Sequence, residues 1–308
     1  SQGALVRPHQ VVEAGRMSIM KKVGLFYFSG TGATKLVAGH IRDTMQRMGC
    51  EVSLYNIEHL HKREDLPDMN GFDLIGLGSP VIGFSTPRRM NQFIGILPVS
   101  QARNKVFVFR TCGGVAETNH TASHHMIRRL RGKKYEVFHE RLFSIGSNWV
   151  FKFDDTIMQQ LYVATKRKID ILCRQVIEGE TRLYRPSVGL RLKKGFVAVQ
   201  ARLAFPLLGK NLKVMDHCTK CGVCMRNCPS ANIRMKEEKI RFNTNCTACL
   251  RCVYGCPQKA IRFRFFSFIP LKNGYDLQRS LSMDAGGEAE TNGRVPAFFA
   301  RYVKDDSI

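Results

Sequence analysis

Residues 23–34 read VGLFYFSGTGAT, an apolar run followed at once by a turn rich in glycine and hydroxyl groups. The run Val23–Phe28 is typical of a buried strand, and the amphipathic stretch Lys35–Met48 after the turn predicts a helix. A turn between a strand and a helix amino terminus binds anions, because backbone N–H groups and hydroxyls can surround them. No lysine ends the turn and the third glycine of the dinucleotide fingerprint is absent, which argues against ATP and NAD at this phosphate site.

Strand and helix patterns alternate through the first half of the chain. Further strands are predicted at Glu51–Asn56, Leu74–Ser79, Lys105–Thr111 and Tyr135–Phe143, and helices at Pro87–Ile96, Ala122–Arg131 and Asp155–Ile177. This alternation predicts an α/β fold, a doubly wound parallel sheet with helices on both faces. Ligands of such sheets bind at the carboxyl ends of the strands, where the loops 29–34, 79–84 and 111–114 are expected to meet.

The pattern Ser/Thr-x-Thr-Gly-x-Thr, which residues 29–34 match at every specified position, resembles the FMN-phosphate loop of flavodoxins. The resemblance covers about Lys21–Arg182 and implies a flavodoxin-like sheet of strand order 2-1-3-4-5. It implies that the FMN phosphate is held by Ser29, Gly30, Thr31, Gly32, Ala33 and Thr34. It also implies that the flavin ring is flanked by two loops, which are Ser79, Pro80, Val81, Ile82, Gly83 and Phe84, and Thr111, Cys112, Gly113 and Gly114.

The two ring loops lack the Trp or Tyr pair that stacks on the flavin of many flavodoxins. Phe84 is their only aromatic residue, and Trp149, the sole tryptophan, is a second candidate for covering the ring. Each has a simpler alternative, which is packing in a core or an interface. Cys112 is either a small apolar residue of the loop or a redox thiol. Residues 29–34 could also be a helix-capping turn that binds no ligand.

Eight of the eleven cysteines lie between residues 218 and 256 in two groups of identical spacing, Cys-x2-Cys-x2-Cys-x3-Cys-Pro. In this spacing three cysteines bind one [4Fe-4S] cluster, and the cysteine before the proline binds the other. The first cluster is therefore assigned to Cys218, Cys221, Cys224 and Cys256, and the second to Cys246, Cys249, Cys252 and Cys228. Zinc and a disulfide knot are the weaker alternatives, because zinc prefers two separated Cys-x2-Cys pairs.

Residues 216–264 resemble the two-cluster bacterial-type ferredoxins, small α+β domains, and their cysteine pattern is complete. The chain then divides into an irregular extension 1–20, a flavodoxin-like domain 21–182, a basic linker 183–215, a ferredoxin domain 216–265 and a tail 266–308. The whole order resembles the fused flavodoxin–ferredoxin electron-transfer proteins of anaerobic bacteria and archaea. This implies FMN, two [4Fe-4S] clusters and electron relay to or from a partner oxidoreductase. The alternatives are a flavin-dependent reductase of a quinone or enone and a redox sensor.

The chain is strongly basic, with 48 Lys and Arg against 25 Asp and Glu, a formal net charge of +23 and a pI near 9.9. An acidic redox partner is one explanation, and an anionic membrane surface is another. For the membrane, the basic and apolar segment Arg191–Leu208 is either an interfacial helix or a linker helix packed on one domain. Nucleic acid is the least favoured partner. Since neither a secretory signal nor an apolar run of 18 residues occurs, a cytoplasmic location is expected. The histidines of residues 120–125 are expected on a solvated basic helix.

Overall fold

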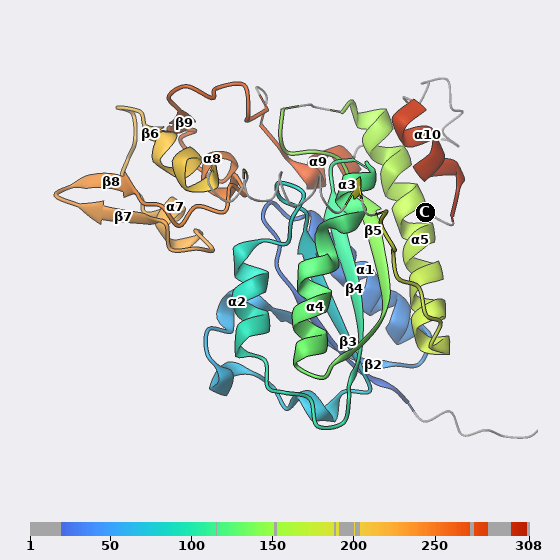
Figure 1. The fold of residues 1–308 in the computed structure, drawn as a ribbon. Helices are drawn as coiled ribbons and strands as arrows, with labels where there is room; N and C mark the ends of the chain where they lie inside the picture. The colour runs from blue at the N-terminus through green and yellow to red at the C-terminus, as the bar shows by residue number, and fades with distance from the viewer. Residues whose placement is uncertain are drawn as a thin grey trace, which may run out of the picture.

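Figure 1 shows the fold in a computed structural model, which describes residues 20–114, 116–150, 153–187, 189–190, 200, 204–271, 274–282 and 297–306. The predicted extension up to residue 19, most of the segment Arg191–Leu208 and the middle of the tail lie outside these described residues. No helix within the described ranges is long and apolar enough to cross a membrane.

The first domain is built on one parallel sheet of order β2-β1-β3-β4-β5, which confirms the predicted flavodoxin-like arrangement. Apart from β2 at the sheet edge, its strands are buried along almost their whole length, because helices cover both faces. The strands are β1 (Lys22–Tyr27), β2 (Glu51–Asn56), β3 (Leu74–Pro80), β4 (Lys105–Cys112) and β5 (Glu136–Ser144).

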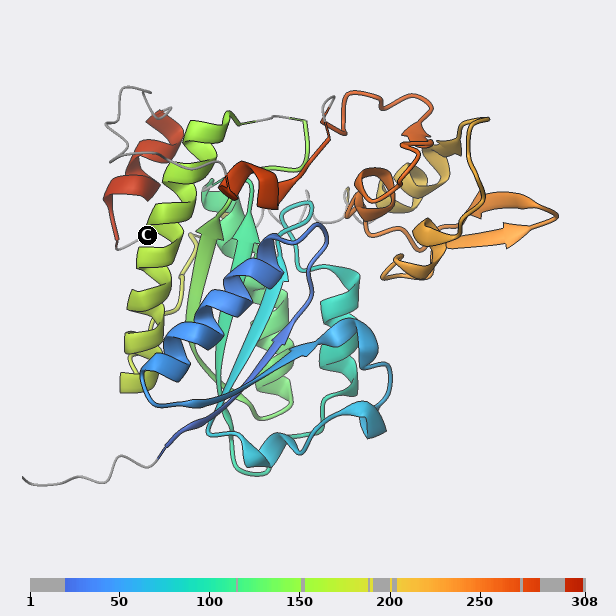
Figure 2. The same ribbon diagram turned by 180° about the vertical axis from the view of Figure 1, so that it is seen from behind.

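Two helices cover each face of this sheet, as Figures 1 and 2 show from opposite sides. One face carries α1 (Ala33–Arg47) and α5 (Asp155–Glu178), and the other carries α2 (Arg88–Ile96) and α4 (His124–Gly132). The longest of them, α5, has clear end signals. The Asp154 carboxylate accepts a hydrogen bond from the N–H of Ile157 at 2.7 Å, and Gly179 ends the helix at a φ of 78°.

The short helix α3 (Glu117–His120) follows β4 and corrects one prediction. Arg110 donates to the carbonyls of Asn119 and His120, each at 2.9 Å, and so holds this helix end against the sheet. Burial, and then the charge of Arg110, lowers the pKa of His120 to about 4. The ring is therefore uncharged at neutral pH, and the prediction of a solvated position is wrong for His120, although His125 is exposed.

The second domain contains two small antiparallel sheets and two one-turn helices. β6 (Leu212–Val214) pairs with β9 (Ile261–Phe263), and β7 (Ile233–Lys236) pairs with β8 (Lys239–Phe242). The helices α7 (Val223–Arg226) and α8 (Arg251–Tyr254) occupy matching places in the two halves of the cysteine repeat. The backbone repeats as well, because left-handed residues recur at equivalent positions, Lys220 with Ala248, Gly222 with Leu250, and Ala231 with Lys259.

The two domains share packing, since Ile82 and Trp149 of the first domain lie against the hydrophobic core of the second. The tail returns to the first domain through α9 (Leu277–Ser282) and α10 (Ala297–Lys304), and α10 lies beside α5 in both views. Tyr302 of α10 is fully buried. Its hydroxyl accepts a hydrogen bond from the N–H of Ser144 at 3.1 Å and lies 2.8 Å from the hydroxyl of Thr165. The helices α9 and α10 of the tail therefore pack on the first domain, whereas Ile269 near the start of the tail packs in the core of the second.

We expect Tyr302→Phe to lower the melting temperature of the holoprotein by about 2–4 °C, since it leaves the buried N–H of Ser144 without an acceptor at a penalty of about 1 kcal/mol. The matched control is Tyr162→Phe, which removes a half-buried hydroxyl 2.7 Å from the ring of His40. Thermal unfolding of both variants measures the difference. A shift for Tyr302→Phe no larger than that of the control would contradict the role given to α10.

Candidate functional site

The loop after β1 forms an anion cradle at the start of α1. Gly32 caps the helix with a φ of 107°, no side chain bonds to the first N–H groups, and the first turn contains no acidic residue. The amides of this turn are therefore free to bind an anion. The Ser29 hydroxyl accepts from the N–H of Gly32 at 3.2 Å, and the buried hydroxyls of Thr34 and Thr111 lie 2.7 Å apart. These groups fit a phosphate.

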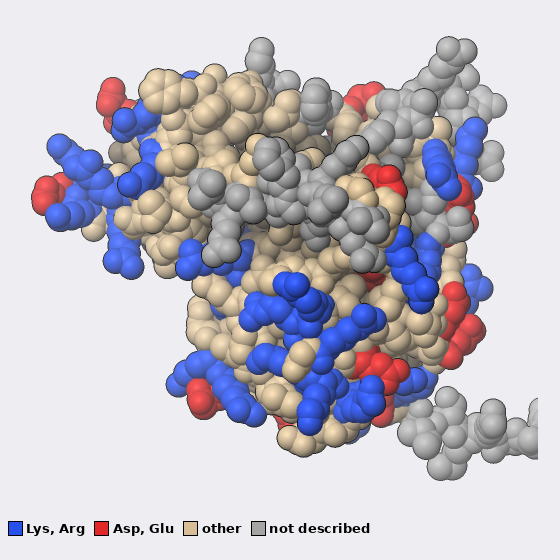
Figure 3. All heavy atoms as spheres, in the orientation of Figure 1, with Lys and Arg blue, Asp and Glu red and all other residues tan. Residues whose placement is uncertain are grey.

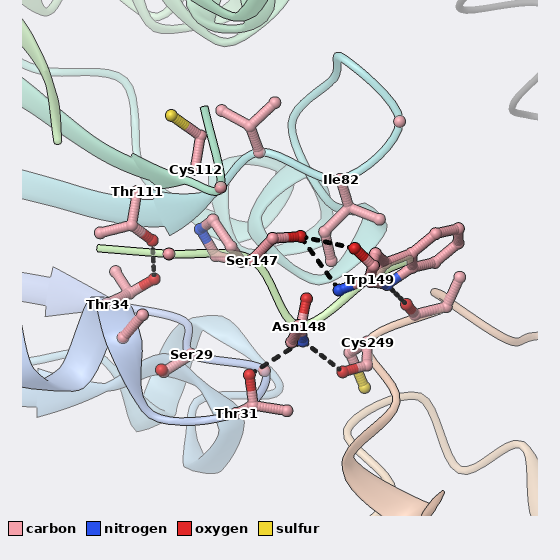
Figure 4. Close-up of a pocket in the computed structure, with 18 of the residues that line it drawn as sticks. Ser29, Thr31, Thr34, Ile82, Thr111, Cys112, Ser147, Asn148, Trp149 and Cys249 are labelled. Atoms are coloured by element: carbon pink, nitrogen blue, oxygen red, sulfur yellow. Dashed lines mark hydrogen bonds between the residues drawn. The ribbon is translucent and has the colours of Figure 1, made fainter. Parts of the chain in front are cut away.

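A cavity of about 300 Å³ opens beside this cradle, at the carboxyl ends of the strands (Figure 4). Most of the sequence-predicted flavin residues line it, namely Ser29, Gly30, Thr31, Ala33, Thr34, Pro80, Val81, Ile82, Gly83, Phe84, Thr111, Cys112, Gly113 and Trp149. Gly32 lines an adjoining hollow, whereas Ser79 and Gly114 are not among the lining residues of either. Cys249, predicted as a cluster ligand, also lines the cavity, and sequence reasoning missed the remaining lining residues, which are Asn119, Gly146, Ser147, Asn148, Ala248 and Tyr275.

One wall of the cavity is a tight hairpin turn. Ile82 and Ser85 exchange two backbone hydrogen bonds of 3.1 and 3.2 Å, and the residues between them, Gly83 and Phe84, have φ values of 56° and 55°. Two consecutive left-handed residues define a type I′ turn, in which glycine or asparagine is usual. Phe84 in this conformation costs about 1–2 kcal/mol, and its ring remains 39% exposed beside the cavity. Strain of this kind is concentrated at ligand sites.

The loop after β5 closes the cavity on the side of the second domain. The Asn148 side-chain amide donates to the hydroxyl of Thr31 at 2.9 Å and to the carbonyl of Cys249 at 3.5 Å (Figure 4). The indole N–H of Trp149 donates to the carbonyl of Ala248 at 3.2 Å. Trp149, predicted as a possible cover for the ring, therefore lines the cavity and also joins the domains.

Cys112 lies at the end of β4 and is buried. Its thiol donates to the carbonyl of Gly114 at 2.8 Å, and burial raises the pKa of Cys112 to about 12. A thiol with this pKa is protonated at neutral pH and is a poor nucleophile. The geometry therefore favours the reading of Cys112 as a small packing residue over that of a redox thiol.

We expect Cys112→Ala to retain the flavin content and to change the rate of flavin reduction by less than about threefold, because the thiol carries no charge near the cavity. Absorbance of the bound flavin and anaerobic stopped-flow reduction measure both quantities. Cys173→Ala, at another fully buried thiol far from the cavity, is the control for packing loss. A drop of more than about tenfold for Cys112→Ala alone would restore the redox reading.

The eight clustered cysteines are predicted to form two crossed sets, and the pKa values of two of them are raised by nearby thiols. Burial, and then the thiols of Cys256 and Cys218, raises the pKa of Cys224. Burial, and then the thiols of Cys249, Cys246, Cys228 and Cys224, raises the pKa of Cys252. Each cysteine that precedes a proline is thus close to the opposite group. We call Cys218, Cys221, Cys224 and Cys256 the outer set, and Cys228, Cys246, Cys249 and Cys252 the inner set.

Backbone N–H groups point at the sulfurs in the same way in both halves. The first cysteine of each group accepts from the residue two positions later, from Lys220 at 3.5 Å and from Ala248 at 3.3 Å. The fourth accepts from the residue four positions later, from Asn232 at 3.2 Å and Ala260 at 3.3 Å. Such bonds stabilise thiolates and tune an iron–sulfur cluster. Within the described ranges no three His, Cys, Asp or Glu side chains are placed to hold one metal ion.

The inner set lies against the phosphate loop. A Cβ added to Gly30 would meet the Cβ of Cys249 at 3.1 Å, closer than ordinary van der Waals contact, so the two domains approach each other tightly at Gly30. Cys249 and Ala248 also line the cavity. The structure therefore places one ligand set directly beside the predicted flavin site.

Arg251 links the two domains at this point. Its Nε donates to the carbonyl of Gly30 at 2.8 Å, and one terminal nitrogen donates to the carbonyl of Ser29. The two terminal nitrogens also bond both carboxylate oxygens of Glu58, at 2.7 and 2.5 Å. Only 22% of the Arg251 side chain and 15% of the Glu58 side chain are exposed. Sequence reasoning missed this pair because 193 residues separate its members.

Comparison with known proteins supports the second domain directly. Residues 210–257 match the family described as a 4Fe-4S dicluster domain. None of the curated proteins matches the chain in sequence.

Similar solved structures cover about half of this chain. They include a flavodiiron core from Synechocystis, with 18% identity over 53% of this chain and 38% of that one and a TM-score of 0.37. Oxidised flavodoxin 1 from Bacillus cereus has 16% identity over 51% of this chain and 97% of that one, with a TM-score of 0.38. Rubredoxin oxygen:oxidoreductase from Desulfovibrio gigas has 13% identity over 51% of this chain and 35% of that one, with a TM-score of 0.38. The chain thus spans little more than a third of the flavodiiron core and of the oxidoreductase.

Proposed function

We propose that this chain is an electron-transfer protein that binds FMN in the cavity and a [4Fe-4S] cluster on each cysteine set, and that it exchanges electrons with a partner oxidoreductase. The match of residues 210–257 to a 4Fe-4S dicluster domain supports the clusters. The uncapped, acid-free start of α1 and the hydroxyls of Ser29, Thr31 and Thr34 support the FMN phosphate.

The observation that carries the proposal is the position of Cys249, which belongs to the inner set and lines the cavity together with the phosphate loop. FMN, when bound, supplies a carrier of one or two electrons. Asn148 and Arg251 hold the loop and the inner set in one arrangement, so donor and acceptor are kept at high effective concentration.

One cysteine of the outer set is more accessible than any of the inner set. Cys221 is exposed, whereas Cys249 is half-buried at the domain contact. We therefore propose that a partner protein exchanges electrons with the outer set, and that the inner set lies between the outer set and the flavin. Reduced thiols are needed to assemble both clusters, which fits the reducing cytoplasm of an anaerobe.

The surface beside the outer set supports an acidic partner. Exposed basic residues gather on the β7–β8 hairpin and on the first cysteine group, and Figure 3 shows blue side chains along this hairpin. They are Lys220, Arg226, Arg234, Lys236, Lys239 and Arg241. The acidic residues of the hairpin are Glu237 and Glu238, and Glu238 is paired with Lys220 at 2.9 Å. A basic surface speeds the approach of an acidic one, and added salt reduces this effect.

The cavity lining favours a carrier over a reductase of small acceptors. Its described side chains include hydroxyls, amides, the phenol of Tyr275 and two thiols, which are Cys249 and Cys112, and burial raises the pKa of Cys112 to about 12. No histidine or carboxylate is among these lining residues. A reductase that protonates its acceptor needs a proton donor whose pKa lies near the working pH.

Composition of the protein purified without air tests this function. We expect about one FMN and about eight irons per chain, with a yellow flavin spectrum beneath the brown absorbance of clusters. Colourless protein, or protein that contains zinc in place of iron, would contradict the proposal.

A further inference from the structure

Four large apolar side chains are exposed at one end of the second domain. Phe265 is 79% exposed, Leu207 66%, Phe268 63% and Phe266 39%. Three of them belong to residues 265–268, which we call the aromatic loop. Single exposed apolar residues are common, but a concentration of this kind marks a site of contact.

The aromatic loop is held firmly at both ends. Phe263 before it and Ile269 after it are buried, each 5% exposed. The N–H of Phe265 donates to the side-chain carbonyl of Asn211 at 3.1 Å, and the carbonyl of Ile269 accepts from the N–H of Val150 at 2.8 Å. The exposed phenylalanines are therefore presented by an anchored loop.

Leu207 belongs to the same patch. Residues 204–211 are helical, so Leu207 and Asn211 are one turn apart on one face of this helix. Asn211 contacts the aromatic loop through its side chain and accepts from the N–H of Arg264 at 2.9 Å through its backbone. Leu207 also lies near the carboxyl end of the segment Arg191–Leu208, which the sequence analysis gave as either an interfacial helix or a packed linker helix.

Cations lie around the patch, and the hollow that Lys210, Lys213 and Arg264 line also contains Asp216 and Glu238. Lys213 and Arg262 face each other in the β6–β9 pairing, and Lys210 and Arg264 lie beside Asn211. Residues 204–215 and 259–271 contain no Asp or Glu. In Figure 3 the surface above β9 and the loop that follows it is largely free of red.

We propose that the aromatic loop docks this protein on an anionic membrane surface. Phenylalanine and leucine enter the boundary between headgroups and acyl chains, while the four cations meet the negative headgroups. Phe265 and Phe268 project into solvent, as insertion into a bilayer requires. The β7–β8 hairpin, on which a protein partner is proposed to dock, carries none of these four side chains. The inference goes beyond the electron-transfer function and does not depend on it.

Co-sedimentation of the holoprotein with vesicles tests the proposal, with phosphatidylcholine alone compared with equal parts of phosphatidylcholine and phosphatidylglycerol. We expect binding to the anionic vesicles only, and weaker binding as salt rises. Phe265→Ser/Phe268→Ser should weaken this binding by about tenfold or more. Lys213→Gln/Arg262→Gln should do the same through the headgroup contacts.

Matched controls lie on the first domain, where Val163 is 57% exposed and Arg174 and Arg185 are exposed. Val163→Ser and Arg174→Gln/Arg185→Gln should change vesicle binding by less than about threefold. Iron and flavin contents equal to those of the wild type show that a variant is folded. If the phenylalanine variant does not fold, the variant Lys213→Gln/Arg262→Gln tests the proposal in its place. Absence of binding to anionic vesicles at low salt would overturn the proposal, and so would binding that survives loss of the phenylalanines. Slower exchange with a protein partner, without vesicle binding, would assign the loop to protein docking and also overturn it.

Discussion

Cys249→Ser is expected to lower the iron content from about eight to about four per chain and to abolish electron exchange between the outer set and the flavin. Cys249 is a ligand of the inner set, and it lies beside the phosphate loop and lines the cavity. Without the inner set, the outer set has no neighbour through which it can reach the cavity. Iron analysis and the kinetics of flavin reduction, both measured without air, follow the two effects.

Cys221→Ser is the matched variant, because Cys221 holds the same place in the first cysteine group as Cys249 in the second. It should also remove about four irons, since the outer set loses a ligand. Exchange between the inner set and the flavin should continue, and only reduction by a protein partner should stop. If Cys221→Ser and Cys249→Ser lose electron exchange with the flavin equally, the inner set is not the set that exchanges electrons directly with the flavin.

Arg251→Ala is expected to slow exchange between the inner set and the flavin by about tenfold or more and to destabilise the holoprotein by about 2 kcal/mol. The substitution leaves the carboxylate of Glu58 and the carbonyls of Ser29 and Gly30 without their shared partner. The stability loss is smaller than that of a fully buried pair because both side chains keep some exposure. Weaker fixing of the loop also predicts weaker FMN binding.

Arg226→Ala is the control for Arg251→Ala, since Arg226 lies in the first cysteine group and donates to the carbonyl of Cys221 at 3.1 Å. It should leave flavin exchange within about threefold of the wild type, because Arg226 touches only its own domain. Arg251→Lys should be more stable than Arg251→Ala, but a lysine cannot form the two parallel hydrogen bonds to the carboxylate of Glu58. If Arg251→Ala lowers stability while the exchange rate is unchanged, the clamp does not position the inner set.

Local patterns predicted most of the fold. Glu51–Asn56 occurs as a strand with the predicted bounds, and the other strands of the sheet differ by one residue at one end or at both, because buried apolar runs and turn residues mark them along the chain. The strand order came from the phosphate-loop motif, which is specific enough to imply a topology. The crossed cysteine sets stay a prediction of the spacing, with which the nearness of Cys256 to Cys224 and of Cys228 to Cys252 agrees.

The contacts between distant segments could not be predicted in this way. Asn148 and Arg251 have no motif around them, and their roles arise only when the second domain lies against the loop after β1. Tyr302 returns to β5 from the far end of the chain, and no periodicity predicts its partner. The environment of His120 could not be predicted, because charge and polarity in the sequence do not show that Arg110 bonds the carbonyls at the end of α3.

The central claim is that the inner set and the cavity form one electron-transfer unit within a single chain. Flash reduction of the holoprotein, followed at the absorbance of the flavin, measures this at several protein concentrations. We expect a first-order exchange between flavin and cluster whose rate is independent of protein concentration and which Cys249→Ser removes. A rate that rises in proportion to protein concentration, or the same rate in Cys249→Ser, would contradict the account.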